Sequence, residues 1–224
     1  NCGGVPQLDN VKRLSAAQQE AYNNILFQFL KKNVVLLRGV TSSGKTEIYI
    51  HLIKQALERH EQVLYLLPEI ALTVQIRQRL QKVFGDRLGI YHSKYSDAER
   101  VEIWKKQLSD SPYDVILGAR SAVLLPFSKL GLVIIDEEHE TSFKQQDPAP
   151  RYHARSVAIM LAHQHGAKTL LGSATPSAES WHNAETGKYG LVELDERYKG
   201  IEMPEIKVVD VKDMQRRKMM YGPI

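Results

Sequence analysis

The sequence predicts an α/β fold in which a mostly parallel sheet carries helices on both faces. Short β-rich runs alternate with longer helical patterns along most of the 224 residues, and this order is typical of parallel strands joined by helices. The runs are apolar throughout, as expected for strands that are buried on both sides. With 43% hydrophobic and 25% charged residues, the composition is that of an ordinary globular chain and excludes general disorder.

The elements follow from the hydrophobic pattern in chain order. Apolar runs predict strands, and segments with apolar residues at helical spacing, several of them after a serine, threonine or aspartate that can cap a helix, predict helices. The expected strands are 34–38, 62–67, 88–91, 113–118, 130–136 and 168–172, and the expected helices are 15–31, 45–59, 70–84, 97–109, 155–165 and 178–186.

Charge and hydropathy limit the classes of partner. A formal net charge of +4 permits binding to nucleic acid without requiring it. The longest apolar run, residues 130–135, is far shorter than the roughly 18–20 residues that span a bilayer, so no membrane partner is expected. No secretory signal is visible, and a cytoplasmic location is the expectation.

A phosphate-binding loop is the strongest motif. It matches GxxxxGKT between an expected strand and an expected helix, the context in which backbone N–H groups and a helix N-terminus hold an oligophosphate. Lys45 is expected to reach the β- and γ-phosphates and Thr46 to ligate Mg²⁺. The alternative is a loop that merely turns a strand into a helix. The residues expected to bind nucleotide are Gly39, Val40, Thr41, Ser42, Ser43, Gly44, Lys45 and Thr46.

An acidic cluster follows the expected strand 130–136. Asp136 ends this apolar strand and is expected to hold Mg²⁺, while the adjacent Glu137 is expected to take a proton from an attacking water. Alone, such a cluster is more often a solvated loop or a helix cap. Beside a GKT loop, a catalytic role is favoured.

A long polar connection runs from residue 139 to residue 153. Aromatic residues alternate there with cations, which gives stacking faces for bases beside charges for phosphates. The alternative is that the aromatic side chains pin the loop to the body of the protein. The residues expected to contact DNA are Phe143, Lys144, Arg151, Tyr152 and Arg155.

The combined motifs resemble those of the superfamily 2 helicases. DEEH at 136–139 follows GKT, LPEIALTVQ at 67–75 resembles motif Ia, GARS at 118–121 resembles motif Ic and GSATP at 172–176 resembles motif III. Together with KQQ and RYHAR, the DEEH sequence is similar to the replication-restart branch of that superfamily. The resemblance covers roughly residues 11–210 and implies a RecA-like P-loop NTPase lobe.

The resemblance implies further roles. Gln18 resembles the glutamine that recognises adenine, and Thr73 and Arg120 fall in motifs that contact DNA. Ser173 and Thr175 fall in motif III, which couples hydrolysis to movement. His139 either links the metal site to motif III or is a satisfied loop histidine, and its motif position favours the link. Ser42 departs from the family, which often has glycine there.

The resemblance also implies the domain organisation. Residues 1–10 are expected to be an N-terminal flank, 11–195 the first helicase lobe and 196–224 a basic linker. No second-lobe motif, arginine finger or cysteine-rich insertion is found, so the isolated lobe is expected to be nearly inactive. The implied cofactors are ATP and Mg²⁺, with zinc only in the absent C-terminal part. The implied partners are branched or single-stranded DNA, other primosome proteins and single-strand-binding proteins, in the bacterial cytoplasm at the nucleoid.

Two other classes of function fit the sequence less well. A P-loop phosphotransferase would need a lid and an acceptor pocket, and it would not explain GSATP. A DNA-binding scaffold with a vestigial nucleotide site would be expected to lose Lys45, Thr46, Asp136 or Glu137, and all four are present. An ATP-dependent DNA helicase in replication restart is therefore the favoured function.

Overall fold

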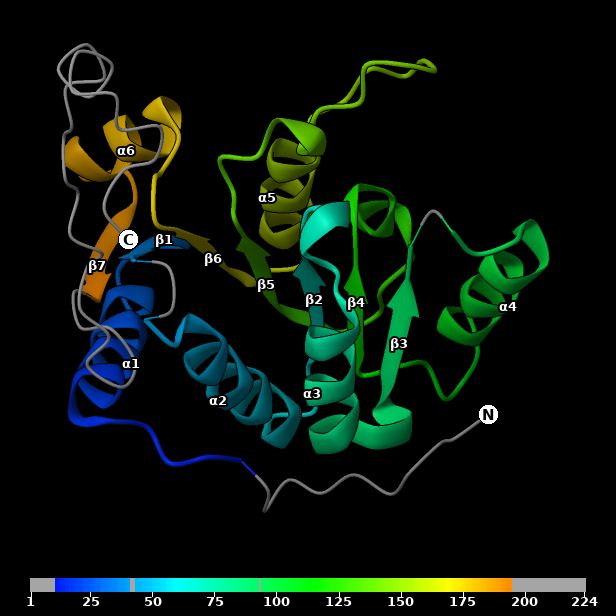
Figure 1. The fold of residues 1–224 in the computed structure, drawn as a ribbon, viewed down its shortest axis with the longest axis horizontal. Helices are drawn as coiled ribbons and strands as arrows, with labels where there is room; N and C mark the ends of the chain where they lie inside the picture. Colours follow the sequence, from blue (N-terminus) through cyan, green and yellow to red (C-terminus); the bar gives the residue numbers. More distant parts are fainter. Residues whose placement is uncertain (1–10, 41–42, 93, 195–224) are drawn as a thin grey trace, which may run out of the picture.

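Seven parallel strands form the centre of the structure (Figure 1). The structure is a computed structural model that describes residues 11–40, 43–92 and 94–194. The strands lie in the order β3-β4-β2-β5-β6-β1-β7. Their bounds are β1 Val34–Gly39, β2 Gln62–Leu66, β3 Leu88–Tyr91, β4 Val115–Gly118, β5 Leu130–Asp136, β6 Lys168–Ser173 and β7 Gly190–Leu194. The predicted parallel sheet is confirmed.

Helices cover both faces of the sheet, as predicted. Helices α1 to α3 contribute to one buried apolar cluster, whereas α4 to α6 contribute to the other. The bounds are α1 Ala16–Phe29, α2 Lys45–Glu58, α3 Val74–Phe84, α4 Asp97–Gln107, α5 Ala154–Gln164 and α6 Ala178–Glu185. Each strand therefore lies between two apolar layers, which explains why the strand sequences are apolar without alternation.

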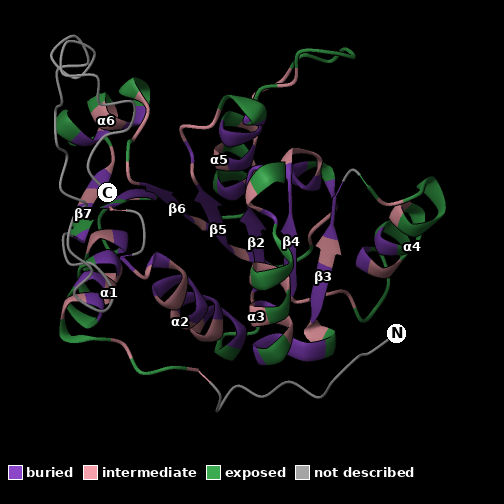
Figure 2. Cartoon of the chain, in the orientation of Figure 1, coloured by how far each residue is buried: buried purple, intermediate pink, exposed green. Residues whose placement is uncertain are grey.

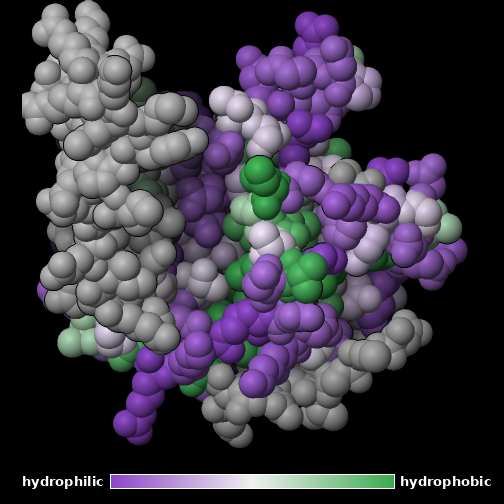
Figure 3. Space-filling view, viewed as in Figure 1, coloured by the Kyte–Doolittle hydropathy of each residue, from purple (hydrophilic) through white to green (hydrophobic). Residues whose placement is uncertain are grey.

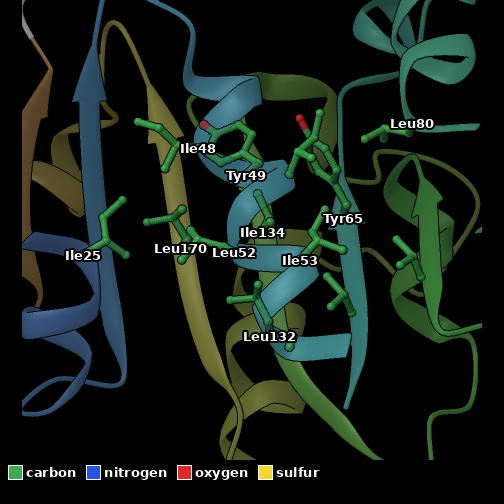
Figure 4. Packing of buried hydrophobic residues seen from close by; sticks show 14 of the residues in the cluster. Ile25, Ile48, Tyr49, Leu52, Ile53, Tyr65, Leu80, Leu132, Ile134 and Leu170 are labelled. Carbon is green, nitrogen blue, oxygen red and sulfur yellow. The ribbon is translucent and has the colours of Figure 1, made fainter. Parts of the chain in front are cut away.

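The pleat of each strand divides its side chains between the two clusters. In β1, Val35 and Leu37 join the α1 to α3 cluster, while Val34 and Leu36 join the other one. The central strands are buried along nearly their whole length (Figure 2). Figure 4 shows α2 lying across the first face, with Leu52 and other α2 side chains directed at the strands. This packing fixes the position of the loop that precedes α2.

Side-chain caps begin several helices where the sequence predicts them. Ser15 and Ser96 form capping boxes at α1 and α4, and Ser177 caps α6. The predicted start of a helix at residue 70 is wrong. Residues Glu69–Ala71 form a short 3₁₀ turn, η2, and α3 begins only after Thr73, whose hydroxyl accepts from the backbone N–H of Ile76 at 3.4 Å.

Strand β7 and the structure of the long connection are among the elements that were not predicted. Strand β7 pairs with β1 in parallel. It was missed because it has only five residues and is partly polar. The long connection contains a 3₁₀ turn, η5 (Thr141–Phe143), and then a hairpin, defined here as residues 144–153. An antiparallel bridge joins Lys144 to His153, and the N–H of Gln145 donates to the carbonyl of Tyr152 at 2.8 Å. The hairpin projects above α5 in Figure 1 (yellow-green).

The division of the chain into a flank, a lobe and a linker stays a prediction, and the described residues fall within the predicted lobe 11–195. The predicted flank 1–10 and linker 196–224 lie outside the described residues. In the described part, no helix is long and apolar enough to cross a membrane. The face seen in Figure 3 is mostly hydrophilic, with hydrophobic side chains gathered near its centre around α3. Ile70 and Val74, both exposed, lie just before and at the start of this helix.

Candidate nucleotide-binding and hydrolysis site

Three neighbouring strands bring the predicted motifs to one edge of the sheet. β6 pairs with both β5 and β1, so their carboxyl ends lie side by side. In register, Asp136 of β5 lies opposite Gly172, and Ser173 of β6 lies opposite Arg38, one residue before Gly39. Ligands of open α/β sheets bind at this edge. The glycine-rich loop, the acidic turn (residues 136–139) and motif III therefore meet there.

The side chain of Lys45 contacts the first residues of the glycine-rich loop. Its ammonium group donates to the carbonyl of Gly39 at 2.8 Å and to that of Val40 at 3.4 Å, and the residue is buried. Gly44 has a φ of 83°, a left-handed conformation that favours glycine, and it begins α2 without a side-chain cap. Thr41 and Ser42 lie outside the described residues.

The described part of the loop fits an oligophosphate. The buried hydroxyl of Ser43 has no hydrogen-bond partner among the described residues, so it is free to interact with a ligand. A Cβ added at Gly39 would lie 2.9 Å from this hydroxyl and 3.3 Å from Cδ of Lys45, so glycine keeps the cradle open. Thr46 is half-buried in the first turn of α2. The N-terminus of α2 favours a negative charge here.

Asp136 is a buried carboxylate at the end of β5. The hydroxyl of Tyr49 on α2 donates to its Oδ1 at 2.9 Å, and the backbone N–H of Glu137 donates to the same oxygen at 3.1 Å. Burial raises the pKa of Asp136 to about 6, and the positive charge of Lys45 opposes this rise. A carboxylate that burial destabilises gains much from a nearby cation, so Asp136 and Thr46 fit the role of Mg²⁺ ligands.

Tyr49 is a site residue that the sequence analysis missed. It is fully buried, and burial raises its pKa well above 10, so its hydroxyl stays a hydrogen-bond donor to Asp136. Gly172 makes room for it, because a Cβ there would lie 1.9 Å from the Tyr49 hydroxyl. Tyr49 lies one turn after Lys45 in α2 and looks like an ordinary core residue in the sequence. Its contact with Asp136 joins residues 87 positions apart.

Glu137 is more exposed than the neighbouring Asp136. Its φ of 51° is unusual for a residue other than glycine and turns the chain sharply at the end of β5. The side chain of Glu137 is 35% exposed, and its Oε2 lies 3.7 Å from Nδ1 of His139. The two adjacent carboxylates thus have different surroundings. That of Asp136 is buried, whereas that of Glu137 is partly exposed to water. This arrangement suits the predicted division of roles.

His139 contacts motif III. Its Nδ1 lies 2.7 Å from the hydroxyl oxygen of Ser173, and that oxygen accepts from the backbone N–H of Thr175 at 3.0 Å. A direct connection between the acidic turn and motif III is therefore present. Its role in coupling stays a prediction.

Gln18 lies beside the glycine-rich loop but is engaged within the protein. Its amide nitrogen donates to the carbonyl of Gly44 at 3.2 Å, and its amide oxygen accepts from the N–H of Ser15 at 2.8 Å. Because both ends of the amide are occupied and the residue is buried, recognition of adenine requires these bonds to be exchanged. The adenine-binding role stays a prediction.

Phe143 does not present a face on which a DNA base could stack in this structure. Its side chain is completely buried and belongs to the apolar cluster that includes α5, so it pins the long connection to the body of the protein. Tyr152 is half-buried and packs against the same cluster. The aromatic character of this segment thus serves packing as well as any contact with bases.

Arg155 also differs from its predicted role. Its side chain is 9% exposed, and its guanidinium forms ion pairs of 2.7 Å with both Glu138 and Glu179. A cation neutralised by two carboxylates does not present its charge to a DNA phosphate. The sequence analysis missed Glu138 as a site residue, although its place in DEEH was visible.

The remaining predicted DNA contacts lie on or near the same edge. Lys144 and Arg151 are exposed on the hairpin, and Thr73 is exposed at the start of α3. Arg120, in the 3₁₀ turn η4 (Arg120–Leu124), donates to the carbonyls of Ser142 and Lys144 at 3.1 and 3.3 Å. A cleft of about 200 Å³ lies between these motif segments, and it is lined by Pro68, Glu69, Ala119, Arg120, Ser121, Ser142 and Phe143.

Replacing Phe143 by alanine is expected to lower the free energy of unfolding by about 3–5 kcal/mol, because it leaves a cavity in the core. Urea denaturation of residues 1–224 measures this loss. Tyr152→Ala is the matched control and is expected to cost less, since the tyrosine is only half-buried. A loss below about 1 kcal/mol for Phe143→Ala would contradict the structural role.

Comparisons with known proteins agree with the motifs and the fold. The replication restart protein PriA of Bacillus subtilis (strain 168) is 44% identical over 183 residues, which cover 82% of this chain and 22% of that protein. The corresponding protein of Haemophilus influenzae (strain ATCC 51907 / DSM 11121 / KW20 / Rd) is 40% identical over 224 residues, which cover 99% of this chain and 30% of that protein. The chain thus spans about a quarter of the length of these relatives.

Solved structures support the RecA-like helicase fold. The structure of RecG bound to a three-way DNA junction matches 85% of this chain and 25% of that chain, with a TM-score of 0.61 and 23% identity. The helicase domain of Pyrococcus furiosus Hef matches 87% of this chain and 41% of that chain, with a TM-score of 0.57 and 17% identity. The model of the DEAD/DEAH box helicase family matches residues 15–183. The chain therefore belongs to the DEAD/DEAH box helicase family.

Proposed function

We propose that this chain is the nucleotide-binding lobe of an ATP-dependent DNA helicase that acts in replication restart. The observation that carries the proposal is the meeting of Lys45, Asp136 and the His139–Ser173 contact at one sheet edge. A phosphate cradle, a metal ligand and a connection to motif III are the parts that a nucleotide-driven motor needs from one lobe. The names of the relatives support the biological process, and DNA-bound fold neighbours support the substrate.

The positions of the side chains support a role for each of them in this proposal. Lys45 and the loop N–H groups would hold the β- and γ-phosphates, and Thr46 and Asp136 would hold Mg²⁺, whose charge would offset that of the phosphates. Glu137 takes a proton from the attacking water. Tyr49 keeps the carboxylate of Asp136 directed at the metal site. Gln18, which donates to the carbonyl of Gly44, would exchange this bond for one to adenine.

DNA would bind across the same edge without readout of sequence. The proposed contacts are chiefly with the phosphates of the DNA strand. The residues proposed to make them are Thr73, Arg120, Lys144, Arg151 and the half-buried Tyr152. Primosome proteins, single-strand-binding proteins and a zinc-containing segment elsewhere in a longer protein belong to the same proposal. A cytoplasmic, nucleoid-associated location in a bacterium follows from it.

Lys45→Ala is expected to weaken the binding of Mg-ADP roughly 10- to 100-fold, because a charge-assisted contact to phosphate contributes about 1.5–3 kcal/mol. Titration of residues 1–224 with a fluorescent ADP analogue measures this change. Lys54→Ala, which removes a lysine further along the same helix, is the control and should bind like the unchanged chain. Equal affinity of Lys45→Ala and the unchanged chain would refute the proposed phosphate site.

A further inference from the structure

Glu138 is a buried anion in the middle of the acidic turn. Its side chain is completely buried, yet neither the metal site nor the proton transfer proposed above uses it. One carboxylate oxygen accepts from the backbone N–H of Ser177 at 2.7 Å. The other accepts from Arg155, Ser177 and Ser180 at 2.7, 3.0 and 2.9 Å. All four bonds come from segments that are distant in the sequence, so Glu138 joins separate elements.

Arg155 is the cationic half of this junction. Its Nη1 donates to the side chain and the backbone carbonyl of Glu138 at 2.7 and 3.2 Å and to the hydroxyl of Ser177 at 2.9 Å. Its Nη2 donates to Glu179 at 2.7 Å. The guanidinium therefore fastens the first turn of α5 to the acidic turn and to the start of α6, which follows motif III.

Arg155 also lies just after the hairpin in the sequence. His153 pairs with Lys144 across the hairpin base, and Arg155 follows only two residues later. On the other side of the hairpin, buried Phe143 and the bonds from Arg120 hold the chain to the body. The hairpin base is therefore continuous with the first turn of α5, and Arg155 connects this turn to Glu138, which lies between Glu137 and His139.

We propose that Glu138 is a positioning residue through which the hairpin controls the catalytic turn when DNA binds. The proposal rests on the function proposed above. A buried ion pair with several short hydrogen bonds is stiff, because any movement of one partner leaves a charge unpaired in the protein interior. The Glu138–Arg155 pair therefore makes the position of Glu137 and the His139–Ser173 contact depend on the position of the hairpin.

The test is a comparison of ATPase rates in a longer protein that contains this chain and a second helicase lobe. Glu138→Gln keeps the shape of the side chain and removes its charge. We expect the ratio of DNA-stimulated to DNA-free kcat to fall by roughly 2- to 30-fold, the range of a coupling free energy carried by such a network. The DNA concentration for half-maximal stimulation should change less than twofold, because Glu138 does not touch DNA.

Two further variants separate positioning from stability. Arg155→Lys keeps the charge but cannot donate to Glu138, Ser177 and Glu179 together, so it should also lower the ratio. Glu179→Gln removes the charge of the other partner of Arg155, whose side chain is 66% exposed. This variant should leave the ratio within twofold of that of the unchanged protein. Thermal unfolding of each variant reports whether it is folded.

The outcomes are distinct. An unchanged ratio in either folded variant, or an equal fall of DNA-free and DNA-stimulated rates, would overturn the inference. Failure of both variants to fold would also count against it, since stability alone would then explain the pair. If the unchanged protein shows no stimulation by DNA, the proposed function itself fails. If the unchanged protein is stimulated and the variants are stimulated equally, only the role of Glu138 fails.

Discussion

Glu137→Gln is expected to slow ATP hydrolysis by about 10²–10⁴-fold in the presence of DNA, because it removes the positioned base while it preserves the shape of the side chain. The sharp turn at Glu137 separates its carboxylate from the buried Asp136 and leaves it open to water. The phosphate loop and the metal ligand are unchanged in this variant. Nucleotide affinity should therefore stay close to that of the unchanged protein.

Steady-state hydrolysis and nucleotide titration on the same preparation separate these two effects. Glu140→Gln makes the same chemical change three residues later, where the carboxylate lies 3.8 Å from the other ring nitrogen of His139. This control should retain most of the activity. Hydrolysis by Glu137→Gln at the rate of the unchanged protein would show that another group accepts the proton.

Residues 1–224 alone are expected to hydrolyse ATP about 10³–10⁵-fold more slowly than a longer protein that contains the second lobe. The described lobe offers a phosphate cradle, a buried metal ligand and a base, and Lys45 is the cation seated in its loop. The resemblance assigns the arginine finger to the second lobe. Without that cation, about 4–7 kcal/mol of stabilisation of the transition state is missing.

The comparison requires saturating nucleotide, so that weak binding by the open lobe is not mistaken for slow chemistry. Both proteins are measured with saturating single-stranded DNA, and Lys45→Ala of the 224-residue chain defines the background. A rate for residues 1–224 within tenfold of the longer protein would show that one lobe suffices for hydrolysis.

Much of the fold was predictable because it depends on local patterns. The mostly apolar runs 34–38 and 130–136 are strands that helices cover on both faces of the sheet. Ser15 and Ser96 cap helices through hydrogen bonds with residues three positions later. Strand β7 was not predictable in the same way. It is short and partly polar, and pairing with β1 defines it as a strand.

The outline of the candidate site was also visible in the sequence. A GKT loop after one strand and an acidic turn after another must lie at the carboxyl ends of their strands, and parallel pairing brings those ends to one edge. What the sequence could not predict is the direction of each side chain. Phe143 and Arg155 have the residue types of a DNA-binding loop. However, Phe143 is buried in the core, and Arg155 is paired with two carboxylates.

The sequence by itself determined the fold class, the phosphate loop and the acidic turn, because each is specified by residues close together in the chain. The tertiary structure alone decided which partner each buried polar group has. Tyr49 holds Asp136 across 87 positions, and Arg155 holds Glu138 rather than a phosphate. A buried charge or hydroxyl without a partner costs free energy. The role of a buried polar residue therefore depends more on the elements that meet around it at the sheet edge than on its sequence motif.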